Sequence, residues 1–221
     1  MQTTKQQILA LLKRTGAVTI EEAAGALSIA SMTARQHLIG LELDGLITAE
    51  KIRRATGRPH FLYSLTPKGD EMFPRRYDIL AQLLLEEVGL LCGADIDLLT
   101  PAGRRSLLVQ RSADRLAERF RSQVTGQSLE ERVVAVTEVL HLIGGFAEWR
   151  RNEDVFEIRD FNCVFARLME ETESGCEWHV RLLTGLLHWP VRHEMMVSGR
   201  AVCCLYAVDP NATPSEEGLS H

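Results

Sequence analysis

The chain has 221 residues, of which 45% are hydrophobic and 25% are charged, a composition typical of soluble globular proteins. No run approaches the roughly eighteen apolar residues of a membrane helix, and the N-terminus lacks a secretory signal, so we predict a cytoplasmic protein with reduced thiols and no membrane partner. The net charge of −5 is uneven: residues 1–76 carry 11 Lys and Arg against 7 Asp and Glu, and residues 77–221 carry 14 against 23. The basic N-terminal part therefore favours a polyanionic partner, above all nucleic acid.

Three helices are predicted in the first 44 residues. The first has a one-sided apolar stripe and ends at Gly16, a residue suited to a left-handed cap. The second begins at a capping box formed by Thr19 and Glu22. The third spans about Ser31–Asp44 and is ended by Gly45. The inner face of the third helix is predicted to consist of Ala34, Leu38 and Leu41.

A β-hairpin with a basic tip follows these helices. The predicted strands are Leu46–Ile52 and His60–Leu65, and the Gly- and Pro-containing segment between them forms a turn. Thr66-Pro67 then begins a short helix that extends to Phe73. Three helices followed by a basic hairpin is the element order of a winged helix-turn-helix domain, which we place at residues 1–76.

The third helix carries side chains that can read base edges in the major groove of double-stranded DNA. There, Arg can bond guanine and Gln can bond adenine. The candidate DNA-contacting residues on this helix are Ser31, Thr33, Arg35, Gln36 and His37. The candidates on the wing are Arg53, Arg54 and Arg58, which would contact phosphates or a minor groove and supply position rather than specificity. The alternative is that these residues are solvated charges on a small α/β module.

The sequence around these elements resembles a known family. SIASMTARQHLIGLELDGLI, followed by GRPHFLYSLTPKGDEMFPRRY, is similar to the DeoR/ArsR-type winged-helix regulators over about residues 4–77. The resemblance implies a DNA-binding transcription regulator. Ala30 is a departure, because such families usually carry a polar helix cap at this position.

The rest of the chain is expected to complete an α+β fold. Residues 77–125 contain two amphipathic helices, which we assign to a helical linker and dimerisation region because of family habit; an ordinary core stripe is the alternative. Residues 126–209 are predicted to form an α+β sensor domain that begins at a capping box of Ser128 and Glu131. Its later elements are a hairpin at 146–161, helices at 163–172 and 177–187, and strands at 191–197 and 201–208. Residues 210–221 are predicted to be disordered.

Four of the five cysteines fall in the predicted sensor domain, together with three histidines. Adjacent residues on a strand point to opposite faces, so Cys203 and Cys204 cannot readily share one site. Taking Cys203 gives the set Cys163-x12-Cys176-x11-His188-x14-Cys203. Thiolates with an imidazole suit zinc or an iron–sulfur cluster. The alternative is that the cysteines are small core residues, and Cys92 is assigned to that role outright.

These segments resemble a second family. DFNCVFARLMEETESGC and HWPVRHEMMVSGRAVCCLY are similar to the C-terminal region of the SufR family, cluster-binding repressors of iron–sulfur assembly operons. Cys163, Cys176 and Cys203 match the first, second and fourth family cysteines, and His188 stands at the third. The resemblance implies a homodimeric repressor that senses iron–sulfur status or oxidative stress through a 4Fe–4S or 2Fe–2S cluster. His193 or Cys204 could substitute as the fourth ligand.

Three other functions remain open at this point. A structural zinc site would stabilise the same fold without sensing, and an apolar pocket in the second domain would accept a small-molecule effector. A thiol enzyme could use Cys176 and His179, which lie three residues apart on a predicted helix. The sequence shows neither an oxyanion site nor a third orienting group, so we predict that the protein is not an enzyme.

Overall fold

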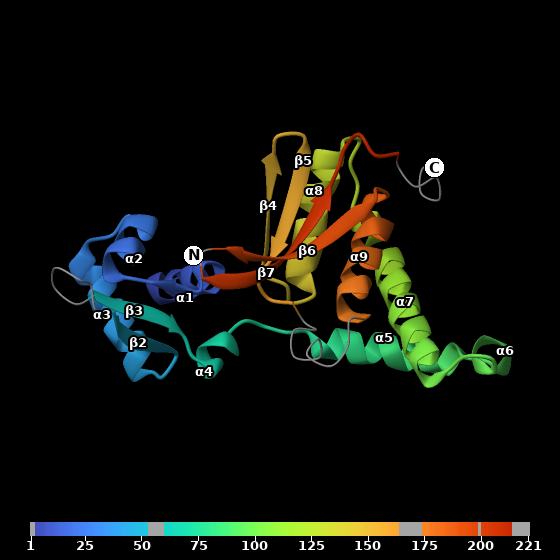
Figure 1. Cartoon of the computed structure of the whole chain (residues 1–221), viewed down its shortest axis with the longest axis horizontal. Helices are drawn as coiled ribbons and strands as arrows, with labels where there is room; N and C mark the ends of the chain where they lie inside the picture. The colour runs from blue at the N-terminus through green and yellow to red at the C-terminus, as the bar shows by residue number, and fades with distance from the viewer. Residues whose placement is uncertain (1–2, 53–59, 164–173, 199, 214–221) are drawn as a thin grey trace. The chain divides into compact units, whose positions relative to one another are not determined.

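Figure 1 shows the computed structural model, which describes residues 3–52, 60–163, 174–198 and 200–213. The chain divides into two compact units, Met1–Pro74 with Met196–Cys203, and Arg75–Met195 with Cys204–His221. The α+β fold class is confirmed, because N-terminal helices and a small sheet are followed by more helices and a C-terminal antiparallel sheet. The predicted boundary at residue 76 lies two residues after Pro74.

The first unit contains the three predicted helices and the hairpin. The elements are α1 (Thr4–Thr15), β1 (Ala17–Val18), α2 (Ile20–Leu27), α3 (Ser31–Leu43), β2 (Ile47–Ile52), β3 (His60–Leu65) and α4 (Pro67–Asp70). Thr3 caps α1, and Thr19 caps α2 through the predicted capping box. Gly16 and Gly45, which follow α1 and α3, have φ values of 79° and 72°, where glycine is favoured.

The sheet of the first unit has the strand order β1-β3-β2 and is antiparallel. The β2–β3 register pairs Ile47 with Leu65 and Ile52 with His60, as a hairpin requires. The two-residue strand β1 was not predicted. The apolar faces of α1, α2, α3 and the sheet form one core, which leaves the outer side of α3 free for function.

The second unit is built from four long helices and a four-stranded sheet. The elements are α5 (Tyr77–Leu90), α6 (Gly93–Ile96), α7 (Pro101–Phe120), a 3₁₀ turn (Arg121–Gln123), α8 (Leu129–Leu142), β4 (Ala147–Asn152), β5 (Val155–Asp160), α9 (Ser174–Leu187), β6 (Val191–Ser198) and β7 (Ala201–Val208). The end of β6 from Met196 and the start of β7 to Cys203 are counted with the first unit. Thr100 caps α7, and Ser128 caps α8 with the predicted box. The short helix α6 was not predicted, and the predicted helix at 163–172 lies almost entirely outside the described residues. The predicted disordered tail also falls largely outside them.

One hydrophobic core joins all parts of the second unit. The sheet has the order β4-β5-β7-β6; α8 packs against β4 and β5, while α9 packs against α7 and α8 (Figure 1). Leu83 of α5 and Leu116 of α7 belong to the same cluster of buried residues as Tyr206 of β7. The helices at 77–125 are therefore part of this core, and their role in a linker and dimerisation region stays a prediction.

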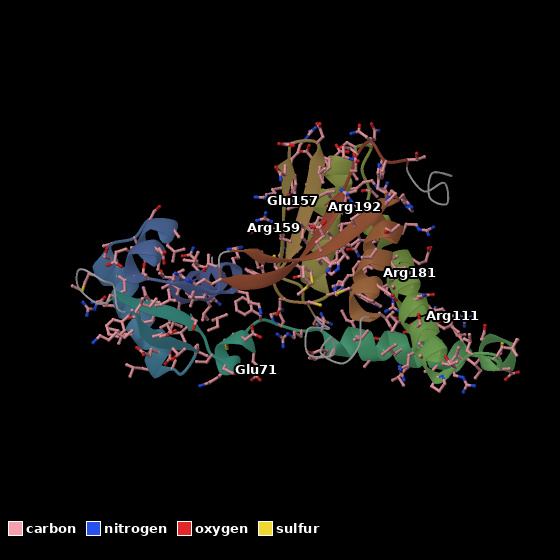
Figure 2. All side chains as sticks on the ribbon, viewed as in Figure 1. Glu71, Arg111, Glu157, Arg159, Arg181 and Arg192 are labelled. Carbon is pink, nitrogen blue, oxygen red and sulfur yellow. The ribbon has the colours of Figure 1, made fainter. Side chains whose placement is uncertain are left out.

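The carboxylate of Glu157 on β5 accepts hydrogen bonds from side chains of β4. Glu157 faces Arg150 in the strand register and accepts a hydrogen bond of 2.6 Å from it. Asn152 and Arg159 donate further bonds of 2.7 and 3.0 Å to the same carboxylate, and Figure 2 shows Glu157 and Arg159 on this sheet. Arg150, Asn152 and Arg159 hold the pKa of the largely buried Glu157 at about 2.

The Glu157 contacts should make stability depend on pH. The folded-state pKa of about 2 lies below the ordinary value of 4.5, so this stabilisation is complete above about pH 4.5 and is lost as the pH falls toward 2. Glu157→Gln should lower the free energy of unfolding at pH 6 by about 1–3 kcal/mol. At pH 3 that difference should fall below half. Urea unfolding at both pH values measures it, with Glu194→Gln at an exposed position of β6 as the control; an unchanged difference at pH 3 would contradict the assignment.

Gly69 in α4 is a second point at which the fold depends on one residue. A Cβ atom at Gly69 would lie 1.9 Å from the backbone oxygen of Leu46, and Thr66 N–H also binds that oxygen at 3.0 Å. Gly69→Ala should therefore destabilise the first unit by about 1–3 kcal/mol. Thermal unfolding followed by far-UV circular dichroism measures the loss.

Two controls make the Gly69 experiment specific. Gly25→Ala on α2 adds a methyl with no atom within 4 Å and should leave stability equal or raise it by up to about 1 kcal/mol. All three tryptophans lie in the second unit, so the fluorescence transition should stay in place in Gly69→Ala. A melting temperature equal to that of Gly25→Ala would show that α4 can move away from Leu46.

Candidate functional site

The outward face of α3 carries the side chains predicted to read DNA. Ser31, Arg35 and Gln36 are exposed, and Thr33 and His37 are half-buried. The opposite face of the helix is buried in the core of the first unit. Because that buried face fixes the rotation of the helix, the five side chains lie together on its outer side. We call these five residues the α3 face.

Two exposed apolar side chains accompany the α3 face. Met32 is 65% exposed and Ile39 is 43% exposed. An apolar side chain in a major groove can contact the methyl group of thymine. The sequence analysis gave neither residue a role, and it is their exposure in the structure that makes them candidates.

The segments on either side of α3 complete the candidate DNA surface. Ala30 occupies the N-cap of α3 and makes no side-chain hydrogen bond to the first turn. Lys51, near the end of β2, is exposed. The predicted wing residues Arg53, Arg54 and Arg58 lie outside the described residues, so their role stays a prediction.

The comparison with known protein families agrees with this surface. Residues 5–56 match the DeoR-like helix-turn-helix domain, a segment that includes α1, α2, α3 and β2. No curated protein matches the chain. Among the described residues, no helix is both long and apolar enough to span a membrane. The match supports a DNA-binding transcriptional regulator, and it covers the residues that form the α3 face.

In the second unit, Cys204 on β7 lies at the centre of a group of sulfur and nitrogen side chains. Hydrogen bonding from Cys163, together with His193 and Tyr206, lowers the pKa of the buried Cys204 thiol to about 6. Burial and the proximity of Cys204 raise the pKa of Cys176. We call Cys163, Cys176, His193 and Cys204 the thiol–imidazole cluster.

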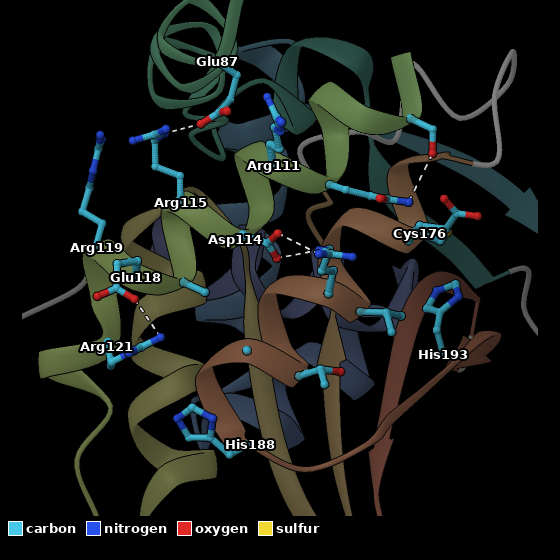
Figure 3. Close-up of a pocket in the computed structure, with 18 of the residues that line it drawn as sticks. Glu87, Arg111, Asp114, Arg115, Glu118, Arg119, Arg121, Cys176, His188 and His193 are labelled. Carbon is cyan, nitrogen blue, oxygen red and sulfur yellow. Dashed lines mark hydrogen bonds and ion pairs between the residues drawn. The ribbon is translucent and has the colours of Figure 1, made fainter. Parts of the chain in front are cut away.

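Four separate segments contribute to this cluster. Cys163 follows β5 closely, and Cys204 is the register partner of Asp160 on that strand. Cys176 lies in the first turn of α9. His193 lies on β6, the strand next to β7, and Figure 3 shows its ring near the end of the groove that also holds Cys176. The fold therefore gathers residues that are 41 positions apart in the sequence.

Two buried polar atoms at the cluster have only a thiol as partner. Among the described residues, His193 Nε2 and Tyr206 Oη have no hydrogen-bond partner other than the thiol of Cys204. The Tyr206 ring lies 5.2 Å from the His193 ring, measured between centroids. A thiol is a weak hydrogen-bonding group, and metal coordination would satisfy the buried imidazole nitrogen more fully. Three thiols with one imidazole are also a donor set suited to zinc or an iron–sulfur cluster.

The thiol–imidazole cluster does not form a coordination shell as it stands. Within the described ranges, no three His, Cys, Asp or Glu side chains are close enough to hold a metal ion. The Cys204 thiol instead donates to Met195 Sδ at 3.7 Å and interacts with Cys163. Metal binding removes thiol protons, so the side chains would have to close around a bound group.

His188 does not reach the other predicted ligands. It follows the C-terminal end of α9, twelve residues after Cys176, a separation of about 18 Å along a helix. Burial, Arg132 and Arg121 lower the pKa of His188, and Figure 3 shows it far from Cys176 in the groove. The structure does not bring His188 to the other predicted ligands, so its role as a ligand stays a prediction; the structure places His193, one of the two alternatives, next to Cys204.

Cys203 lies apart from the other predicted ligands for a different reason, and its role also stays a prediction. Adjacent residues on β7 point to opposite faces of the sheet, and it is Cys204 that interacts with Cys163 and His193. Cys203 is 2% exposed and lies on the other face. The reasoning that only one of these two cysteines can join the site still holds, but the structure selects Cys204.

The pair proposed for a thiol enzyme is poorly suited to nucleophilic chemistry. Burial raises the pKa of Cys176, which lowers its thiolate fraction, whereas a catalytic cysteine needs the reverse. His179 is 1% exposed, and its ring packs edge-on against Trp178 with centroids 4.9 Å apart.

A groove of about 1510 Å³ runs beside α7 and α9, and ion-paired side chains and apolar surface both line it (Figure 3). Arg181 binds Asp114 through hydrogen bonds of 2.5 and 2.7 Å, and Arg115 pairs with the buried Glu87. Pockets for small molecules are mostly apolar with a few polar groups. The groove combines apolar surface with ion pairs, so the small-molecule receptor stays an alternative prediction.

Proposed function

We propose that this chain is a transcriptional regulator whose first unit reads duplex DNA with α3. The observation that carries the proposal is the α3 face, which lies within the segment similar to the DeoR-like helix-turn-helix domain. Arg35 and Gln36 suit guanine and adenine edges in a major groove. The arginines at 53, 54 and 58 would add phosphate contacts that strengthen binding without reading sequence.

Arg35→Ala should weaken binding to the preferred DNA sequence by about 10- to 100-fold, because a bidentate contact to guanine contributes about 1–3 kcal/mol. The sequence is first selected from a pool of random duplexes. Affinity is then measured by fluorescence anisotropy at one fixed salt concentration.

Arg14→Ala is the matched control for Arg35→Ala. It removes the same charge from an exposed position of α1, outside the α3 face, and should change affinity less than about threefold. Equal losses in the two variants would mean that Arg35 contributes only charge, and would contradict base reading.

We also propose that the thiol–imidazole cluster holds an iron–sulfur cluster, through which the regulator senses iron–sulfur status or oxidative stress. Three observations support this cofactor: the interactions of Cys204 with Cys163 and His193, the burial of His193 Nε2, whose one partner among the described residues is that thiol, and the resemblance to the SufR family. When bound, the group would supply a redox-active and oxidant-sensitive centre.

The residues of the chain would couple occupancy of this site to the order of the second unit. The ligands come from the segment after β5, from α9, from β6 and from β7, so a bound group would hold these four segments together. Loss of the group would loosen the four segments and change the distance between the two recognition helices of a homodimer. By its resemblance to the SufR family, the cluster-bound form is the repressor.

Protein purified without oxygen should contain stoichiometric iron and acid-labile sulfide. Cys204→Ser and His193→Ala should each lose most of this iron, because each removes one ligand of the site. Cys203→Ser and His188→Ala are the matched controls and should retain it. Iron, sulfide and zinc content together with the visible absorption spectrum measure the outcome.

Each other outcome of the metal analysis has a defined meaning. Colourless protein with stoichiometric zinc bound by the same four residues would replace the sensor with a structural zinc site. Iron lost from the two control variants but kept in the other two would restore the ligand set Cys163, Cys176, His188 and Cys203. Protein from iron-replete cells without iron, sulfide or zinc would contradict the cofactor and leave a DNA-binding regulator.

A further inference from the structure

The thioether of Met195 on β6 contacts the thiol of Cys204 on β7. Cys204 Sγ lies 3.7 Å from Met195 Sδ. Cys204 is 6% exposed, whereas Met195 is 60% exposed. Most of the Met195 side chain therefore lies in solvent, while its sulfur atom is held against a buried thiol. The iron–sulfur ligand set proposed above makes no use of this contact.

The fold brings three sulfur side chains together at Cys204. Strand β7, which carries Cys204, lies between β5 and β6 in the sheet. Cys163, three residues after the end of β5, interacts with Cys204, and Met195 reaches it from β6. Neighbouring strands lie about 4.8 Å apart, so an ion bound at Cys204 has a further sulfur donor on each side. We call Cys163, Met195 and Cys204 the sulfur triad.

Two thiols and a thioether form a soft donor set. Thiolate and thioether ligands together select monovalent copper, whereas zinc and iron–sulfur clusters take thiolate with imidazole or carboxylate. Monovalent copper also accepts linear and trigonal geometries, so it needs fewer donors than a tetrahedral ion. Within the described part of the chain, no three His, Cys, Asp or Glu side chains are close enough to hold a metal ion. The sulfur triad is compatible with that finding, because its third donor is a methionine.

We propose that the chain without an iron–sulfur cluster binds one monovalent copper ion through Cys163, Met195 and Cys204. The inference goes beyond the proposed function and does not depend on it. The two groups would share Cys163 and Cys204, so they would exclude one another. Both thiols release their protons to the solvent as the copper–sulfur bonds form. The thioether binds through a lone pair, and copper stays monovalent throughout.

The exposure of the three donors favours capture of the ion from solvent. Met195 is the most exposed, Cys163 is half-buried and Cys204 is buried. Methionine has three rotatable bonds and a polarizable sulfur atom, so Met195 is able to bind an ion at the surface and carry it to the two thiols. The buried side of the site excludes water as a competing ligand.

Packing alone is the other explanation of the contact between Met195 and Cys204. Met195→Leu distinguishes the two roles, because leucine keeps the apolar character and nearly the volume of methionine but has no sulfur atom. A packing role predicts that this variant binds copper like the wild type. A ligand role predicts that its copper affinity falls.

Competition with bicinchoninate, a chromophoric chelator of monovalent copper, tests the proposal. The full chain is freed of metal, kept reduced under an oxygen-free atmosphere and titrated with monovalent copper. The wild type should bind one equivalent. Met195→Leu should bind it about 10- to 100-fold more weakly, the effect of losing one supporting contact of a metal site. Met72→Leu is the matched control, because Met72 is 59% exposed in the first unit, and its affinity should not change.

Two variants separate the copper site from the proposed iron–sulfur site. Met195→Leu should keep the iron and sulfide content of the wild type but lose copper affinity. His193→Ala should lose most of its iron but keep its copper affinity. Cys204→Ser should lose both. Unchanged circular dichroism shows that each variant is folded.

Other results would overturn the copper site. A wild type that leaves all copper on the chelator, or equal affinities in the wild type and Met195→Leu, would contradict it. X-ray absorption at the copper edge should show sulfur neighbours alone, and a nitrogen neighbour would contradict the assigned ligands. Absence of iron and sulfide from the wild type would instead count against the proposed iron–sulfur cluster, whatever the copper affinity.

Discussion

The close packing of α9 on α7 positions the candidate sensor site. Where the helices meet, a Cβ atom at Gly185 would lie 3.1 Å from the Cβ of Ala117, so a side chain larger than hydrogen would push them apart. Trp178 Nε1 donates a buried hydrogen bond of 3.1 Å to Ser112 on the same pair of helices. These contacts fix the position of α9 along α7 and its rotation about its own axis. They therefore also fix the position of Cys176, which lies in the first turn of α9 and is close to Cys204 on β7.

Helices and strands with local signals could be predicted from the sequence. Thr19 and Glu22 form a capping box within four residues, and Gly16 ends α1 by a conformation of its own backbone. Nothing local marks β1, because its two residues become a strand only by pairing with β3. The helices of residues 77–125 were predicted at the correct positions. The elements that they pack against could not be predicted, because periodicity shows that one face of a helix is apolar but does not show what covers that face.

The ligands were only partly predictable, because spacing in sequence is not distance in space. Twelve residues separate Cys176 from His188, and the helix between them turns this interval into about 18 Å. Five residues later, His193 lies on β6, beside the strand that carries Cys204. The choice between Cys203 and Cys204 depends on strand register, since Asp160 pairs with Cys204. Neither fact has a signal in the residues themselves.

Ala30 leaves α3, the proposed recognition helix, with an unfinished first turn. Thr3 and Thr19 accept hydrogen bonds from the N–H groups that begin α1 and α2, whereas Ala30 cannot do so for α3. A missing cap of this kind costs a helix about 1 kcal/mol. Phosphate oxygens are strong acceptors for such N–H groups. Phosphates of bound duplex DNA would then cap the first turn of α3, the helix proposed to read the bases. Part of the binding free energy would stabilise this first turn, so α3 would fray less in the complex than in the free protein.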